Sequence, residues 1–176
     1  NLGATESLFG QAGSYSLFIR KETGDTITAR IRDATSVKVL TSNATILSTS
    51  IWYLIIISVD RGTPSNSKIF IQGVDDIASN TYGGLDTITN VNIYRYGGST
   101  SSNLEGYQSM GFMLNSTVSD ANALSFYNGG KPKDPQDFFG SACKWFFNPD
   151  NSGSTAEFTI TDAVNSINTT SVNLED

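Results

Sequence analysis

Histidine is absent from the 176 residues of this chain, and cysteine occurs once, as Cys143. The lack of histidine excludes every catalytic triad or dyad whose base is an imidazole, and all zinc sites that contain histidine. A single cysteine cannot form an intrachain disulfide or a cysteine metal cluster. The stability of the fold must therefore come from side-chain packing and strand pairing.

Charge is also scarce in this sequence. Charged residues make up 16% of the chain, the 11 lysines and arginines are scattered, and the formal net charge is −6. Because a nucleic-acid binder needs clustered basic side chains that displace counterions from phosphates, we expect no nucleic-acid partner. The longest strongly apolar run, Ile51–Ile57, is far shorter than the roughly 20 residues of a membrane-spanning helix, so we expect no membrane insertion. About a third of the residues are Asn, Ser or Thr, which predicts a surface of amides and hydroxyls.

Short segments of alternating apolar and polar residues, separated by turn residues, predict an all-β fold. A hairpin is predicted over residues 15–32, in which Ile27, Ala29 and Ile31 face the core and the even-numbered residues 26–32 face water. Further strands are predicted at 37–40, 91–96 and 155–160.

Residues 51–60 differ from these segments because they are apolar at both parities for most of their length. This pattern predicts a central strand covered on both faces, with Trp52 in the core and residues 68–74 as the antiparallel partner. Residues 75–90 are rich in Asp, Asn and Gly and predict a long surface loop. One short helix is predicted at 119–127, capped by Ser119 or Asp120.

The order of these segments resembles the laminin-G-like, concanavalin A-like lectin domain. In that family a strand that begins with Trp and ends in an acidic residue precedes a turn and a strand that ends in Gly, matched here by Trp52–Asp60 and 68–73. A Gly-aromatic segment then leads to a last strand, matched by 106–107 and 111–114. A short helix followed by Tyr-Asn-Gly-Gly ends the pattern, as in 123–130.

The resemblance covers residues 8–130 and implies a two-sheet antiparallel jelly-roll sandwich that lacks its first strands in this chain. We therefore expect a lectin-like β-sandwich over residues 1–130. We expect residues 131–176 to be a C-terminal extension that packs on the sandwich or on a neighbouring subunit. This extension is similar to tails that follow the domain in virion proteins of marine bacteriophages, and its cluster Trp145-Phe146-Phe147 is equally consistent with an interface patch and with an anchor of the tail.

Two departures from the family pattern bear on calcium. Gln72 stands where the family usually has Asn or Asp, and Ser109 stands where an acidic residue often follows the Gly-aromatic pair. The resemblance therefore gives little support to family calcium coordination, and no cofactor is expected. Asp75, Asp76 and Asp86 are weak calcium candidates, because hard cations prefer carboxylate and carbonyl oxygens.

Catalysis by a glycosidase of this fold requires two carboxylates that face the same bond. No Glu-x-Asp-x-x-Glu pattern occurs, so we expect no enzyme activity and no catalytic residues. Sugar binding requires aromatic rings and hydrogen-bonding side chains. The candidates for carbohydrate binding are Asp75, Asp76, Asn80, Tyr82, Tyr94, Tyr96 and Tyr107. The alternative for these residues is that the tyrosines pack against the sheet and the polar side chains cap turns.

The sequence thus favours a non-enzymatic virion structural protein, a capsid decoration, fibre or tail component that binds host surface glycans at the extracellular virion surface. Its expected partners are other virion subunits in a symmetric homo-oligomer. The alternative hypothesis is a carbohydrate-binding module of a secreted enzyme. Assembly distinguishes the two, since a module binds glycan as a monomer.

Overall fold

The computed structural model describes residues 5–10, 17–32, 37–43, 47–48, 50–60, 62–81, 110–147, 159–161 and 168–170. These residues form mostly antiparallel β-structure with two short α-helices, as expected for an all-β chain. The chain divides into two compact units, Asn1–Tyr107 with Val118–Gly130 and Gln108–Thr117 with Lys131–Asp176. The division into a sandwich over residues 1–130 and an extension over residues 131–176 stays a prediction.

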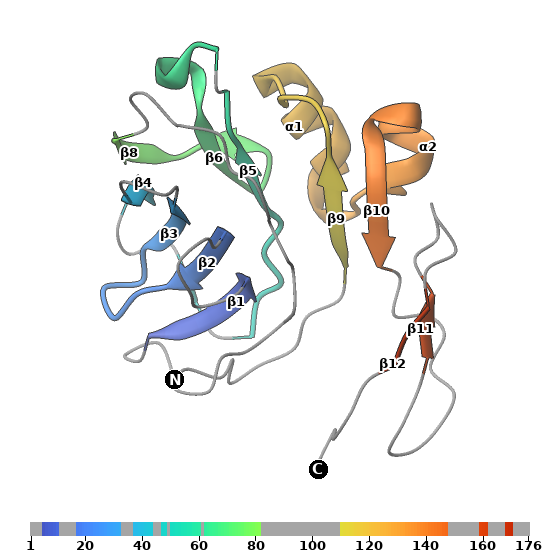
Figure 1. Cartoon of the computed structure of the whole chain (residues 1–176), viewed down its shortest axis with the longest axis horizontal. Helices are drawn as coiled ribbons and strands as arrows, with labels where there is room; N and C mark the ends of the chain where they lie inside the picture. Colours follow the sequence, from blue (N-terminus) through green and yellow to red (C-terminus); the bar gives the residue numbers. More distant parts are fainter. Residues whose placement is uncertain are drawn as a thin grey trace. The chain divides into compact units, whose positions relative to one another are not determined.

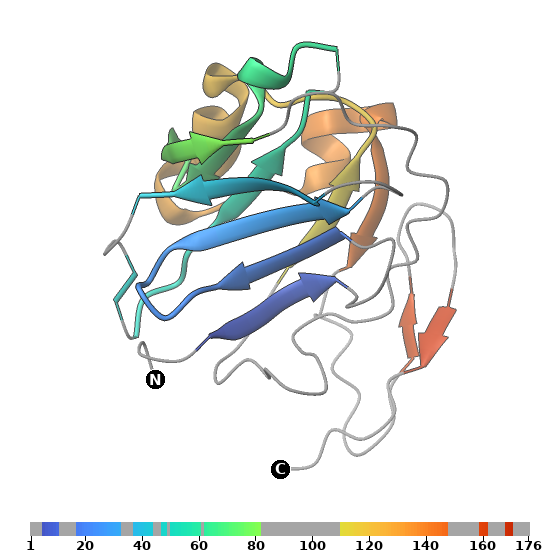
Figure 2. The same cartoon turned by 60° about the vertical axis from the view of Figure 1, so that its left-hand side comes forward.

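The first unit contains a five-stranded antiparallel sheet (Figure 2). Its strands, in spatial order, are β1 (Glu6–Gly10), β2 (Leu17–Lys21), β3 (Ile27–Arg32), β4 (Val37–Ser42) and β8 (Ile77–Asn80). The predicted hairpin is confirmed, because β2 and β3 pair antiparallel from Leu17 opposite Ile31 to Lys21 opposite Ile27.

Strand β8 corrects the first part of the predicted surface loop over residues 75–90, and residues 82–90 lie outside the described residues. It pairs with β4 although β5, β6 and β7 lie between them in sequence. The sequence did not predict β8 because only Ile77 in it is large and apolar, and a strand at the end of a sheet needs few buried side chains. The predicted strand at 91–96 lies outside the described residues.

The alternation of side chains along β3 and β4 determines which residues lie on the inner, core-facing side of this sheet. Ile27 and Ala29 are fully buried, as predicted. Thr28 was expected to face water but is buried on the outer face. Its hydroxyl is satisfied there, since it donates a hydrogen bond to Glu22 at 2.8 Å. Lys38, which a simple alternation would assign to the wet face, lies opposite Ile31 and shares the face of the buried Leu40.

A second sheet contains β5 (Ile55–Ser58), β6 (Lys68–Ile71) and β7 (Val74–Asp75) in that order. The predicted antiparallel partnership of residues 51–60 and 68–74 is confirmed by the pairing of β5 with β6. The connection includes a 3-10 turn, η1 (Pro64–Asn66), and the Asp60 carboxylate accepts hydrogen bonds from the main-chain N–H groups of Gly62 and Thr63, each at 2.9 Å. Strand β5 is shorter than predicted, since it begins only at Ile55.

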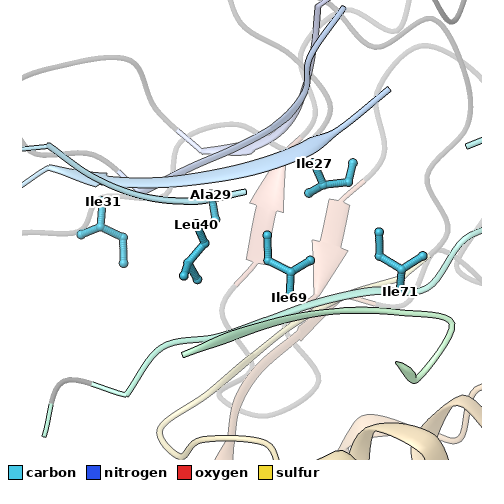
Figure 3. Close-up of a cluster of buried hydrophobic side chains, with 6 residues drawn as sticks. All are labelled: Ile27, Ala29, Ile31, Leu40, Ile69 and Ile71. Carbon is cyan, nitrogen blue, oxygen red and sulfur yellow. The ribbon is translucent and has the colours of Figure 1, made fainter. Parts of the chain in front are cut away.

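The two sheets face each other across one apolar cluster (Figure 3). Its members from the five-stranded sheet are Ile27, Ala29, Ile31 and Leu40, and its members from β6 are Ile69 and Ile71. Full burial of a Leu or Ile side chain contributes roughly 1.5–3 kcal/mol relative to exposure. This cluster therefore holds together strands that are distant in sequence.

Helix α1 (Asp120–Tyr127) lies on the opposite face of the second sheet (Figure 1). It buries Ala123 and Phe126, and Phe70 on β6 is fully buried as well. Ser119 caps the helix by accepting from the N–H of Asn122 at 3.2 Å, and left-handed Asn128 ends it, as predicted from the sequence. A 3-10 turn, η2 (Asn128–Gly130), follows.

Strands β6 and β7 are joined by the two-residue turn Gln72–Gly73. Both residues have positive φ, +54° for Gln72 and +80° for Gly73, which is the requirement of a type I′ turn. A Cβ atom on Gly73 would lie 2.9 Å from both the Cα of Leu124 and the Cβ of Tyr127. Only glycine permits this approach of the turn to α1.

The second unit pairs β9 (Gly111–Leu114) with β10 (Cys143–Phe147), and β11 (Thr159–Thr161) with β12 (Asn168–Thr170). Strand β9, expected as the last strand of the sandwich, is thus paired with the C-terminal segment. Strand β11 overlaps the end of the predicted strand at 155–160.

Helix α2 (Pro135–Phe139), followed by η3 (Gly140–Ala142), was not predicted from the sequence. Prolines 132 and 135 indicated only that the preceding helix must stop. Pro135 instead occupies the first turn of a new helix, where its missing N–H costs nothing. Asp134 caps this helix by accepting from the N–H of Gln136 at 2.8 Å.

We predict that Gly73→Ala lowers the free energy of unfolding by about 3 kcal/mol or more, because the methyl group meets main-chain atoms of α1 in addition to the cost of a left-handed residue. Gly129→Ala is the matched control, since Gly129 has a φ of +63° and open space around its Cα, and it should cost only about 1–2 kcal/mol. Urea unfolding of both variants measures the difference. Equal losses would contradict the close approach of α1 to the turn.

We predict that Leu40→Ala lowers the free energy of unfolding by about 2–5 kcal/mol, because it opens a cavity in the shared cluster. Val37→Ala, on the same strand but 46% exposed, should change it by no more than about 0.5 kcal/mol. Thermal and urea unfolding compare the two variants, and similar losses would show that β4 does not face a common core.

Candidate functional site

Three of the predicted site residues lie in the described part of the chain, on β7, on β8 and between them. These are Asp75, Asp76 and Asn80. The other predicted residues, Tyr82, Asp86, Tyr94, Tyr96 and Tyr107, lie outside the described residues.

Asp75 forms an ion pair with Lys68, with 3.1 Å between its carboxylate and the Lys68 Nζ. The same ammonium group lies 2.5 Å from a carboxylate oxygen of Asp120 at the start of α1. The hydrogen bonds to Asp120 and then to Asp75 raise the pKa of Lys68 above its ordinary value of 10.5. Lys68 therefore joins β6, β7 and α1 through one positive charge.

Asp76 and Asn80 make separate contacts. The Asp76 carboxylate accepts from both the main-chain N–H and the side-chain amide of Asn43, at 3.2 Å each. The Asn80 amide donates to the carbonyl of Pro64 at 2.7 Å. These bonds connect β8 and its flanks to β4 and to the β5–β6 connection, so they stabilise the strand crossing between the two sheets.

Of the three weak calcium candidates, Asp75 and Asp76 are described by the structure, and their carboxylates do not converge on one position. The carboxylates of Asp75 and Asp76 are directed to different partners, Lys68 and Asn43. Across the described residues, no group of three or more Asp, Glu, His or Cys side chains is arranged to hold a metal ion. The pair Asp75 and Asp76 therefore does not form the shared oxygen site that a calcium ion prefers.

Other carboxylates of the first unit form ion pairs with lysine and arginine side chains. One oxygen of Glu22 lies 2.6 Å from Arg20 Nε and 3.2 Å from Arg30 Nη2. On the other face of the hairpin, the buried Lys21 lies between Glu6 and Asp25, at 3.9 and 3.5 Å. These contacts cross-link β1, β2 and β3.

Trp52 is the residue on which the sequence prediction was wrong. It was expected in the core, but its exposed fraction is 63%. Regular pairing of β5 begins only at Ile55, and Tyr53, Ile55 and Ile57 are the residues that pack against the core. Trp52 therefore precedes the paired part of the strand, and its side chain is exposed whereas Ile56 within the strand is buried.

Gln72 holds the main chain at Trp52 and at Leu54. Its main-chain N–H donates to the carbonyl of Leu54 at 2.9 Å, and its side-chain oxygen accepts from the Leu54 N–H at 3.1 Å. Its side-chain amide donates to the carbonyl of Trp52, also at 3.1 Å. The segment that carries Trp52 is thus fixed by a single glutamine, a function that the sequence pattern did not reveal.

Four exposed apolar residues belong to segments that meet at this turn, but they do not share one face of the sheet, because Val74 pairs with the buried Ile71 whereas Leu124 lies on α1. Four of the five large apolar residues that are exposed in the described chain are Ile51, Trp52, Val74 and Leu124. Val74 follows Gly73 directly, Leu124 has its Cα against Gly73, and the carbonyl of Trp52 is bonded to Gln72. The signal for the turn itself in the sequence is the Gln-Gly pair between apolar residues.

Comparison of the chain with known protein families, characterised proteins and solved structures found no match. No helix within the described ranges is long and apolar enough to cross a membrane.

We predict that Lys68→Met lowers the free energy of unfolding at pH 7 by about 1 kcal/mol, the upper range for partly exposed ion pairs. Because the folded-state pKa of Lys68 is raised, this contribution is fully present below pH 10.5 and is lost as the pH rises through the folded-state value. Urea unfolding of wild type and variant from pH 7 to pH 12 should therefore give curves that converge at the alkaline end. A constant difference would contradict a charge-based role.

Proposed function

We propose that this chain is a non-enzymatic structural protein of a virus particle, a capsid decoration, fibre or tail component that binds host surface glycans. The fold proposed for it is a concanavalin A-like jelly roll. The proposal places the protein on the extracellular virion surface, in contact with other subunits of a symmetric homo-oligomer.

The observation that carries the proposal is the pairing of β4 with β8 within the five-stranded antiparallel sheet, which shares one apolar cluster with the second sheet. Neighbouring strands that are distant in sequence are typical of Greek-key and jelly-roll sandwiches. The helix α1 and the Asn128-Gly129-Gly130 segment that follows it occur in the order on which the resemblance to lectin-like domains rests.

The contacts of the carboxylates support a binding protein better than a glycosidase. Glycosidic hydrolysis requires two carboxyl groups roughly 5–9.5 Å apart that face the same bond. In the described chain, Asp75, Asp76 and Glu22 are engaged by Lys68, Asn43 and two arginines. Their bonds stabilise strand pairing and leave these groups poorly placed to act as an acid and a nucleophile.

We predict that single sites bind glycan weakly, with a Kd no better than about 0.1–1 mM, and that many copies on one scaffold raise avidity roughly 10²–10⁴-fold. Binding should be measured on a glycan array with the purified chain, first alone and then coupled to a multivalent bead. Reducing-sugar release should be assayed on the same glycans. We expect retention only of the multivalent form and no sugar release.

Three other results would each change the proposal. Sugar release above a heat-denatured control would overturn the non-enzymatic assignment. Tight glycan binding by a protein that light scattering shows to be monomeric would favour a carbohydrate-binding module of a secreted enzyme. Absence of glycan binding by the multivalent form would remove the attachment role and leave only a structural one.

A further inference from the structure

Helix α1 ends at Asn128-Gly129, which is the one Asn-Gly pair in the sequence. Both residues and the following Gly130 are exposed. A Cβ atom placed on Gly129 would have no other atom within 4 Å, so the space around this residue is open. Because glycine has no side chain, it allows its own main-chain nitrogen to approach the amide of a preceding asparagine more readily than any other residue does.

Three other asparagines of the described chain are protected from such an approach. In each case the main-chain nitrogen of the next residue already donates a hydrogen bond, at 2.8–3.0 Å. The asparagines are Asn66, Asn80 and Asn122, and the bonds run from Ser67 to Pro64, from Thr81 to Val39 and from Ala123 to Ser119. A nitrogen held in this way is directed away from the side chain that precedes it.

The backbone at the end of α1 is left-handed at two consecutive residues. Asn128 has φ 49° and ψ 44°, and Gly129 has φ 63° and ψ 34°. The Gly129 nitrogen reaches the side-chain carbon of Asn128 only after a rotation about ψ of Asn128. The ends of helices open locally at a small free-energy cost, and glycine accepts the altered backbone angles, so this rotation is accessible in the folded protein.

We propose that Asn128 deamidates spontaneously in the folded protein. The main-chain nitrogen of Gly129 loses its proton and forms a bond to the side-chain carbonyl carbon of Asn128. The bond from that carbon to the amide nitrogen breaks, and this nitrogen leaves as ammonia, which carries the proton away. Water then opens the resulting succinimide ring at either carbonyl and gives aspartate or isoaspartate. Water is the only co-reactant, and the modification is independent of glycan binding.

The product places a carboxylate at the end of α1 where it is least favourable. The C-terminal end of a helix carries a partial negative charge, and α1 has no basic residue in its last turn. This end also packs on the β6–β7 turn, since a Cβ atom on Gly73 would lie 2.9 Å from the Cβ of Tyr127. We therefore infer that deamidation weakens the contact of α1 with that turn.

The reaction is tested by ageing the purified full chain in mildly alkaline buffer, folded and in urea. Mass spectrometry with fragmentation locates each converted asparagine, and enzymatic methylation detects isoaspartate. In the folded protein we expect Asn128 to convert faster than Asn122, with isoaspartate among the products. Gly129→Ala should slow the conversion of Asn128 about tenfold, because a methyl group hinders the attacking nitrogen.

Two results would overturn the proposed reaction. Conversion of Asn128 no faster than that of Asn122 in the folded chain would show that the structure protects both, and a faster reaction in urea would locate the protection in the fold. An unchanged rate in Gly129→Ala would exclude attack by the Gly129 nitrogen, and thermal unfolding of this variant verifies that it is folded at the temperature of the assay.

The effect on α1 is tested with two variants that introduce the same charge at opposite ends of the helix. Asn128→Asp should melt a few degrees below wild type at low salt, and the difference should shrink as salt screens the charge. Asn122→Asp, in the first turn, is the matched control and should not lower the melting temperature, because the helix dipole favours a carboxylate there. Equal melting temperatures of the two variants would contradict the inferred weakening.

Discussion

The left-handed turn at Gln72–Gly73 is the constraint on which much of the first unit depends. Its backbone closes the β6–β7 hairpin, and the absence of a side chain at Gly73 allows α1 to approach within van der Waals distance. Its other residue, Gln72, bonds to the segment that precedes β5. One tight turn therefore positions a hairpin, a helix and an exposed aromatic ring, and a change in its geometry would disturb all three.

Polar contacts fix the positions of strands that the apolar cluster holds together. The cluster around Ile69 and Leu40 joins the two sheets but gives little specificity of register, because apolar contacts are not directional. Asp76 with Asn43 and Asn80 with Pro64 supply directional bonds at the point where β8 crosses back to β4. The polar residues that looked like ligand-binding groups in the sequence thus hold the strand crossing in place.

The sequence predicted what depends on local periodicity. The hairpin of β2 and β3, the pairing of β5 with β6, and the helix capped by Ser119 all follow from alternation or from capping chemistry within a short window. Features that depend on tertiary partners were missed. Strand β8 has a polar sequence and forms beside β4. Helix α2 was missed although its signal is local, since Asp134 caps it and Pro135 occupies its first turn.

The candidate site was predictable to a lesser extent. Aromatic and amide residues were sought as sugar-binding groups, and that site stays a prediction, but sequence gives no measure of where the regular pairing of a strand begins. Trp52 lies before the paired residues of β5 and is exposed, whereas Ile56 lies within them and is buried, although both have the same parity. Parity assigns a face only where the chain is a regular strand.

The central claim is that Trp52 is exposed on a backbone held by Gln72, and single-tryptophan fluorescence tests it most directly. Replacement of Trp145 by Phe leaves Trp52 as the only indole in the chain. The account predicts emission typical of a hydrated indole, efficient quenching by acrylamide, and high steady-state anisotropy that falls when Gln72 is replaced by Ala. Blue-shifted emission that resists acrylamide would show that Trp52 is buried and would contradict the account.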